Sequence, residues 1–251
     1  AAGVLTTQNI ATSIDKTVLA NSAADTDLAA GAATIVGGAG EFAVDLGSAN
    51  AANTGRVLGA ALTVTDTGSA TTDTVTLANK STVTATGLAV DVFGGQAVTS
   101  TGYENVAINT GAATGGAQQD ISTLTLTPDA TDAAVSLTVT GANALDIATS
   151  LTTTSTALMT VDASGMNAQA AGTTTFDIGA TSQATGGTAS ITGSAGDDNI
   201  IVGNFASTID GGAGNDTVTG GTAADNLSGG DGVDTISDGG GNDTINGGAG
   251  A

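Results

Sequence analysis

The sequence predicts an all-β protein, in which a β-rich, solenoid-like body leads into a right-handed parallel β-roll. A nine-residue pattern rich in Gly and Asp runs without a break from residue 193. Before it, short segments alternate Thr with aliphatic residues between clusters of Gly, Asn, Asp and Ser. Large aromatic side chains are scarce, with 4 Phe, 1 Tyr and no Trp, which suits a thin core of small and β-branched residues.

Residues 1–111 form the first β-rich region. Segment 12–30 favours a short helix or an irregular arm, and GGAGEFAVD at 37–45 predicts a glycine turn before a strand. Further on, period-two alternation with β-branched residues predicts strands over 62–67, 73–77 and 81–93.

Residues 112–192 form a second β-rich, solenoid-like region, which we separate from the first at the composition shift over 112–119. Pro128 ends one strand and opens a turn, because proline cannot donate to a sheet. The same alternation predicts strands over 122–127, 135–141 and 173–179.

Residues 193–251 form the roll. Two nine-residue repeats make one coil, so residues eighteen apart stack at about 4.8 Å. An aliphatic residue at position eight of each repeat points into the coil: Ile200, Ile209, Val218, Leu227, Ile236 and Ile245. The aspartates at position six form two columns, one of Asp198, Asp216 and Asp234 and another of Asp225 and Asp243.

The carboxylates within one column repel one another unless a cation lies between them. An ion midway between two layers would lie about 2.4 Å from oxygens on each, which is a calcium distance rather than a magnesium distance. Complete pairs predict three calcium sites: Asp198 with Asp216, Asp216 with Asp234, and Asp225 with Asp243. With nine Asp and no basic residue, this region should be largely unfolded until calcium binds.

Some repeats depart from the pattern. Ser207 replaces the position-six aspartate, and the repeat at 202–210 lacks glycine at positions one and four. Ala223 and Asp238 each replace a turn glycine. We therefore expect the turn at 202–210 to bind calcium weakly or not at all.

The repeat GGxGxDxUx resembles the calcium-binding nonapeptide of the RTX family. Together with segments 102–109, 122–147 and 160–168, the chain resembles the C-terminal region of RTX-type surface-layer (S-layer) proteins of Gram-negative bacteria. This resemblance implies type I secretion in an unfolded state, calcium-dependent folding outside the cell, and assembly into a lattice on the bacterial cell surface. It implies as calcium ligands Asp198, Asp216, Asp225, Asp234 and Asp243 with Gly193, Gly196, Gly211, Gly212, Gly214, Gly220, Gly221, Gly229, Gly230, Gly232, Gly239, Gly241, Gly247 and Gly248.

Composition excludes several functions. With 24 Asp+Glu against 3 Lys+Arg and a net charge of −21, the chain has no basic face for nucleic acid. Without His or Cys it has no usual zinc site, no His-based catalytic group and no thiolate nucleophile. No apolar run is long enough to span a membrane. We expect no enzymatic activity, and a second copy of the chain as partner in a lattice or filament.

Other interpretations stay open. A calcium-rigidified RTX adhesin or binding module of a larger secreted protein would show the same repeats. Thr-x-Thr triplets suggest ice binding as another function, although their irregular spacing along the chain argues against a regular face. Because the sequence begins without Met and ends inside a repeat, we expect it to be part of a longer protein. A region outside it would bind outer-membrane surface polysaccharide.

Overall fold

The computed structural model describes residues 61–66, 73–79, 91–111, 117–130, 133–169, 173, 175–183 and 186–250, together with the backbone of strands at 8–9, 16–19, 27–29, 33–37, 41–46 and 57–58. The strand predicted over 81–93 and the boundary predicted over 112–119 lie mostly outside these residues.

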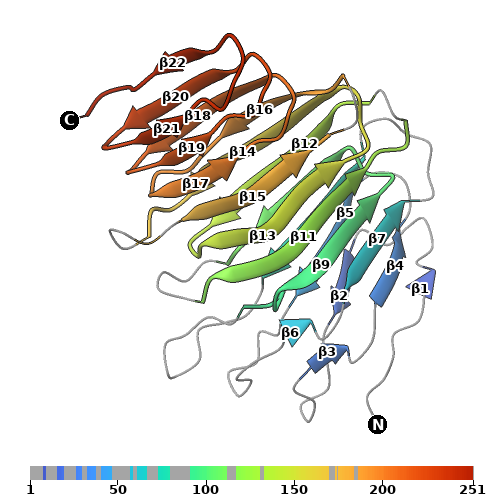
Figure 1. Cartoon of the computed structure of the whole chain (residues 1–251). Helices are drawn as coiled ribbons and strands as arrows, with labels where there is room; N and C mark the ends of the chain where they lie inside the picture. Colours follow the sequence, from blue (N-terminus) through green and yellow to red (C-terminus); the bar gives the residue numbers. More distant parts are fainter. Residues whose placement is uncertain are drawn as a thin grey trace.

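Two parallel sheets of ten strands each run the length of the structure (Figure 1). Each coil gives one strand to each sheet, so that strand order in both sheets follows the sequence. Sheet A contains β1 (Gln8–Asn9), β4 (Ala33–Gly37), β7 (Leu62–Asp66), β9 (Gln96–Thr101), β11 (Gln119–Thr127), β13 (Leu145–Thr153), β15 (Phe176–Ser182), β17 (Asp198–Ile201), β19 (Thr217–Thr219) and β21 (Thr235–Ser237).

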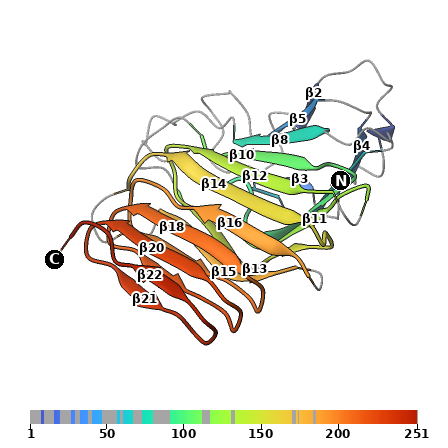
Figure 2. The ribbon, with the colours of Figure 1, turned by 90° about the horizontal axis from the view of Figure 1, so that it is seen from above.

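Sheet B lies opposite, and Figure 2 shows its strands side by side in chain order. It contains β2 (Lys16–Leu19), β5 (Glu41–Leu46), β8 (Thr74–Asn79), β10 (Asn105–Asn109), β12 (Val135–Gly141), β14 (Leu158–Met166), β16 (Thr188–Thr192), β18 (Ser207–Ala213), β20 (Asn226–Asp231) and β22 (Thr244–Asn246). β3 (Asp27–Ala29) pairs with β6 (Val57–Leu58) in a small third sheet.

The predicted all-β architecture is confirmed, since every regular element of the described residues is a strand and the strands pair in parallel. The helix or irregular arm favoured over 12–30 is wrong, because this segment contains β2 and β3. β2 includes the β-branched pair Thr17 and Val18 and is held by a parallel ladder to β5. Among the described residues no helix could cross a membrane.

Most of the strands predicted from alternation are confirmed. β7, β8, β11, β12 and β15 overlap predicted segments, and β11 ends at Thr127, directly before Pro128. Pairing continues across residue 192, where β15 pairs with β17 and β16 pairs with β18. The body and the roll therefore share both sheets, while the divisions at 111 and 192 stay predictions.

The core is a single layer of side chains between the sheets. Position eight of the repeats supplies it in the roll, where Ile200, Val218 and Leu227 are fully buried. Ile245, in the last coil, is 51% exposed. Larger side chains fill the body, including Phe93, Tyr103 and Phe176. The thin core predicted from the composition is therefore correct for the roll, with a wider core upstream.

Threonines on the outer face of sheet A lie in register. Thr63, Thr99, Thr125 and Thr152 are directly paired from strand to strand, as are Thr65, Thr101 and Thr127. Thr152 donates a 3.2 Å hydrogen bond to Thr125. The strands of sheet A thus align triplets that are irregular in the sequence, whereas in sheet B Ala107 lies between Thr76 and Thr138. The expectation of an irregular face is therefore wrong for these coils.

Candidate calcium site

The position-six residues begin or directly precede strands at the two edges of the roll. Asp198, Asp216 and Asp234 form the first column, where the chain enters sheet A. Ser207, Asp225 and Asp243 form the second column, where the chain enters sheet B. The predicted stacking at a spacing of 18 residues is thus present at both edges.

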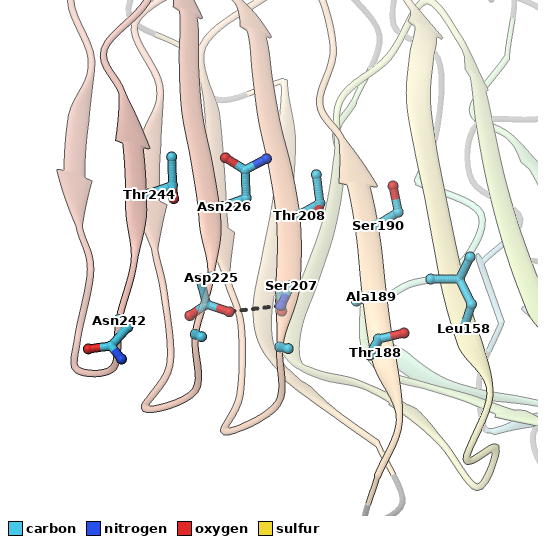
Figure 3. Close-up of a pocket in the computed structure, with 12 residues that line it drawn as sticks. Leu158, Thr188, Ala189, Ser190, Ser207, Thr208, Asp225, Asn226, Asn242 and Thr244 are labelled. Carbon is cyan, nitrogen blue, oxygen red and sulfur yellow. Dashed lines mark hydrogen bonds between the residues drawn. The ribbon is translucent and has the colours of Figure 1, made fainter.

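In both columns, aspartate carboxylates accept a backbone hydrogen bond from the preceding coil. The backbone N–H of Asp198 donates to Oδ1 of Asp216, and that of Asp216 to Oδ1 of Asp234, each at 2.9 Å. In the second column, Figure 3 shows the N–H of Ser207 donating to Asp225 at 2.8 Å. Asp225 donates in turn to Asp243 at 2.9 Å. This ladder fixes one oxygen of each carboxylate and aims the other at the turn.

The second carboxylate oxygen distinguishes the repeats. Oδ2 of Asp216 and of Asp234 is buried without a hydrogen-bond partner. Oδ2 of Asp225 instead accepts the Gly221 N–H at 3.1 Å. Both carboxylate oxygens of Asp198 accept hydrogen bonds from Ser194. The Ser194 N–H donates to Oδ2, and the Ser194 hydroxyl donates to Oδ1 at 2.8 Å. The open oxygens therefore belong to Asp216 and Asp234, a distinction that the sequence analysis missed.

Backbone carbonyls enter the gap between these two turns from both sides. A Cβ placed on Gly232 would overlap the carbonyl oxygen of Gly214, one coil earlier, so that oxygen points along the stack. A Cβ on Gly211 would overlap both Oδ2 of Asp216 and the carbonyl oxygen of Gly229, one coil later. At Gly211, the open carboxylate oxygen of Asp216 and the carbonyl oxygen of Gly229 in the next coil thus approach the same point.

The turn glycines serve two different purposes. In three repeats the glycines at positions two and four both have positive φ: Gly212 and Gly214, Gly230 and Gly232, and Gly239 and Gly241. In the last repeat Gly248 has positive φ and Gly250 does not. Gly196 and Gly221 do not share this conformation, because their repeats carry Ser194 and Ala223 at the other position.

The glycines at position one do not have positive φ: Gly193, Gly211, Gly220, Gly229 and Gly247. In Gly193, Gly211 and Gly229 the absent side chain leaves room for the carboxylate of the same repeat. Gly247 has no atom near its Cβ position.

Burial makes the first column costly to ionise. Desolvation raises the pKa of Asp198 to about 7, against hydrogen bonds from Ser194 that lower it. Desolvation also raises the pKa of Asp216 to about 6, helped by the charges of Asp234, Asp197 and Asp210. A bound cation would reverse both penalties by pairing the buried charges.

These donors fit calcium. All are oxygens, and calcium accepts six to eight carboxylate and carbonyl oxygens in a flexible geometry. In the part of the chain that the structure describes, no three acidic side chains converge on one point. Most ligands must therefore be backbone carbonyls. The pair Asp216 and Asp234 meets these requirements best of the three pairs predicted.

A shallow pocket of about 400 Å³ lies beside the second column (Figure 3). Its lining runs from Leu158 across sheet B to Thr244, and Asp225 is the one ionisable residue in it. Asp225 already accepts two backbone hydrogen bonds. The pocket therefore adds no group to the calcium site.

Comparison with known proteins agrees with this geometry. Residues 192–227 and 219–251 match the family model of the RTX calcium-binding nonapeptide repeat. No curated protein and no solved structure matches the chain significantly. The C-terminal coils are thus RTX-type repeats, and calcium is their ion.

Proposed function

We propose that the protein is an extracellular structural protein that binds calcium through its RTX repeats and self-assembles into a cell-surface layer. The observation that carries this proposal is a row of acids on the outer face of sheet A. Asp120, Asp146 and Asp177 are directly paired across β11, β13 and β15. Like charges directly opposite each other destabilise a sheet, and a cation from outside the chain would relieve this repulsion.

The environment of this acid row favours cation binding. Oδ1 of Asp120 and Oδ1 of Asp146 are buried without a hydrogen-bond partner. Desolvation, followed by the charges of Asp177 and Asp120, raises the pKa of Asp146. Desolvation also raises the pKa of Asp177. A calcium ion shared with a second copy would relieve these penalties and join the two faces.

Net charge makes calcium a switch for assembly. Copies with a charge of −21 repel one another, so they should stay dispersed without divalent cations. Proteins with RTX repeats are typically secreted, and an extracellular location would expose the chain to abundant calcium. A lattice of this kind needs neither enzymatic activity nor a nucleic-acid partner, and it would lie on the bacterial cell surface.

Electron microscopy of the full chain with calcium and with chelator tests the proposal. We expect an ordered sheet or tube that dissolves in chelator. Asp146→Asn should prevent assembly, whereas Asp162→Asn, an acid on sheet B outside this row, should not. Wild-type molecules that stay dispersed at high calcium would contradict the proposal.

A binding module of a larger secreted protein is the second candidate. The registered threonines of sheet A favour it, because a regular array of hydroxyls suits a ligand with a repeating polar surface, such as ice. Freezing-point depression by the full chain, with Thr99→Val and Thr125→Val as variants, tests this ligand. Activity lost in both variants would support the binding module.

A further inference from the structure

The second column extends into the body beyond the nonapeptide repeats. Strand pairing places Ser207 beside Ala189, Ala189 beside Met159, and Met159 beside Val135. One coil further, Asn105 pairs with both Ser136 and Thr74. The residues directly before these strands, Glu104 and Asp73, therefore occupy the same column as Asp225.

Glu104 also repeats the hydrogen bond that defines the column. The backbone N–H of Asp73 donates to Oε2 of Glu104 at 3.3 Å, across one coil of 31 residues. The same contact joins Ser207 to Asp225 across a coil of 18 residues. Glu104 is 3% exposed, and its other oxygen accepts the Asp129 N–H at 3.2 Å. The carboxylate of Glu104 thus stands where a repeat has its position-six aspartate.

A second buried carboxylate, that of Asp66, lies near the same neighbour, Asp129, because desolvation and then the charges of both Glu104 and Asp66 raise the pKa of Asp129. Asp66 ends β7 on the same face as the buried Leu62 and Val64, and it is 6% exposed. Both of its carboxylate oxygens are buried without a hydrogen-bond partner. An ionised carboxylate in this environment costs several kcal/mol unless a cation pairs with it.

Two more oxygens lie near this carboxylate, those of the Tyr103 hydroxyl and of the Asp129 side chain. The hydroxyl of the fully buried Tyr103 has no hydrogen-bond partner, and Asp66 contributes to the raised pKa of that phenol, after burial. A Cβ placed on Gly102 would lie 3.0 Å from both Oδ1 of Asp129 and the Cβ of Asp66, and 3.1 Å from the Asp66 carbonyl oxygen. Gly102 has a positive φ, of 82°, and several turn glycines of the roll also have positive φ.

We propose that Asp66, Glu104 and Asp129 bind a further calcium ion in the body, on the edge that carries the second column. The donors are carboxylate, phenol and carbonyl oxygens, which suit a hard cation with flexible coordination. In the described residues no three acidic side chains already converge on one ion. The exposed Asp129 side chain therefore closes onto the ion when it binds.

Tyr103 provides a probe specific to this site, because the chain has one Tyr and no Trp. Terbium, a luminescent substitute for calcium, emits when a nearby excited tyrosine transfers energy to it. Titrating the full chain with terbium should give emission excited through Tyr103, and added calcium should suppress it. Asp66→Asn should weaken terbium binding at this site at least about tenfold.

The matched control is Asp216→Asn, which alters the roll and should leave the Tyr103-excited emission unchanged. If the Asp66→Asn protein does not fold, Asp129→Asn, which changes an exposed side chain, is used in the same terbium titration. Absence of emission from the wild type would overturn the proposal. So would emission that survives in both Asp66→Asn and Asp129→Asn, or that Asp216→Asn removes. None of these outcomes depends on assembly into a lattice.

Discussion

The backbone N–H of Asp216 donates a 2.9 Å hydrogen bond to Oδ1 of Asp234, while Oδ2 of Asp234 is buried with no hydrogen-bond partner. One oxygen thus joins two coils of protein, and the other is left for an ion. The same division holds for Asp216, whose Oδ1 accepts the Asp198 N–H. Asp216 and Asp234 therefore provide a preformed half of one calcium site.

Replacing Asp234 by Asn should raise the calcium concentration needed to fold the roll by at least about tenfold, because it removes a charged ligand. Circular dichroism of the full chain during calcium titration measures this midpoint. Asp231→Asn, an exposed residue in the same repeat, is the control and should leave the midpoint unchanged. Equal shifts for the two variants would show that only net charge matters.

Gly232→Ala should destabilise the calcium-bound roll by about 2 kcal/mol or more. Gly232 has a φ of 138°, and its Cβ would overlap the carbonyl oxygen of Gly214. Gly240→Ala is the matched control, since no atom lies within 4 Å of its Cβ position. Denaturant unfolding in saturating calcium compares the two. A Gly232→Ala protein as stable as the control would refute the carbonyl arrangement described for this turn.

Without calcium, the roll should be more stable in acid than at neutral pH. Asp198 and Asp216 have folded pKa values of about 7 and about 6, above the ordinary value of 3.8. The folded roll therefore binds protons more tightly than the unfolded chain, and this contribution is lost as pH rises through about 6 to 7.

Unfolding of the full chain in calcium-free buffer at about pH 5 and about pH 8 measures the effect. Asp198→Asn should flatten the dependence, because the amide does not titrate. A calcium-free roll that gains stability on going from the lower to the higher pH would contradict the assignment.

The nonapeptide register was predictable because its coils have one length. A fixed spacing of 18 residues places Asp198, Asp216 and Asp234 in one column without any knowledge of the structure. The same column continues in the body, but its coils differ in length from those of the roll, since 31 residues separate Asp73 from Glu104. No period in the sequence relates Glu104 to Asp225, although the sheets place them on the same edge.

Local substitutions limited the prediction of the site in a different way. Ser194 occupies a position-two glycine site, and its donors satisfy both oxygens of Asp198. The pair of Asp198 and Asp216 therefore looked equal to that of Asp216 and Asp234, although its first carboxylate is already bonded. Hydrogen bonds of this kind depend on rotamers and turn geometry, which a residue pattern does not specify.

Amide hydrogen exchange of the full chain, with calcium and with excess chelator, tests most directly that calcium holds the roll together. The account predicts that the amides of Asp216 and Asp225, which bond to carboxylates of the next coil, are protected in calcium and exchange rapidly in chelator. Amides of β12 and β14 in the body should stay protected in both. Equal protection of the roll with and without calcium would contradict the account.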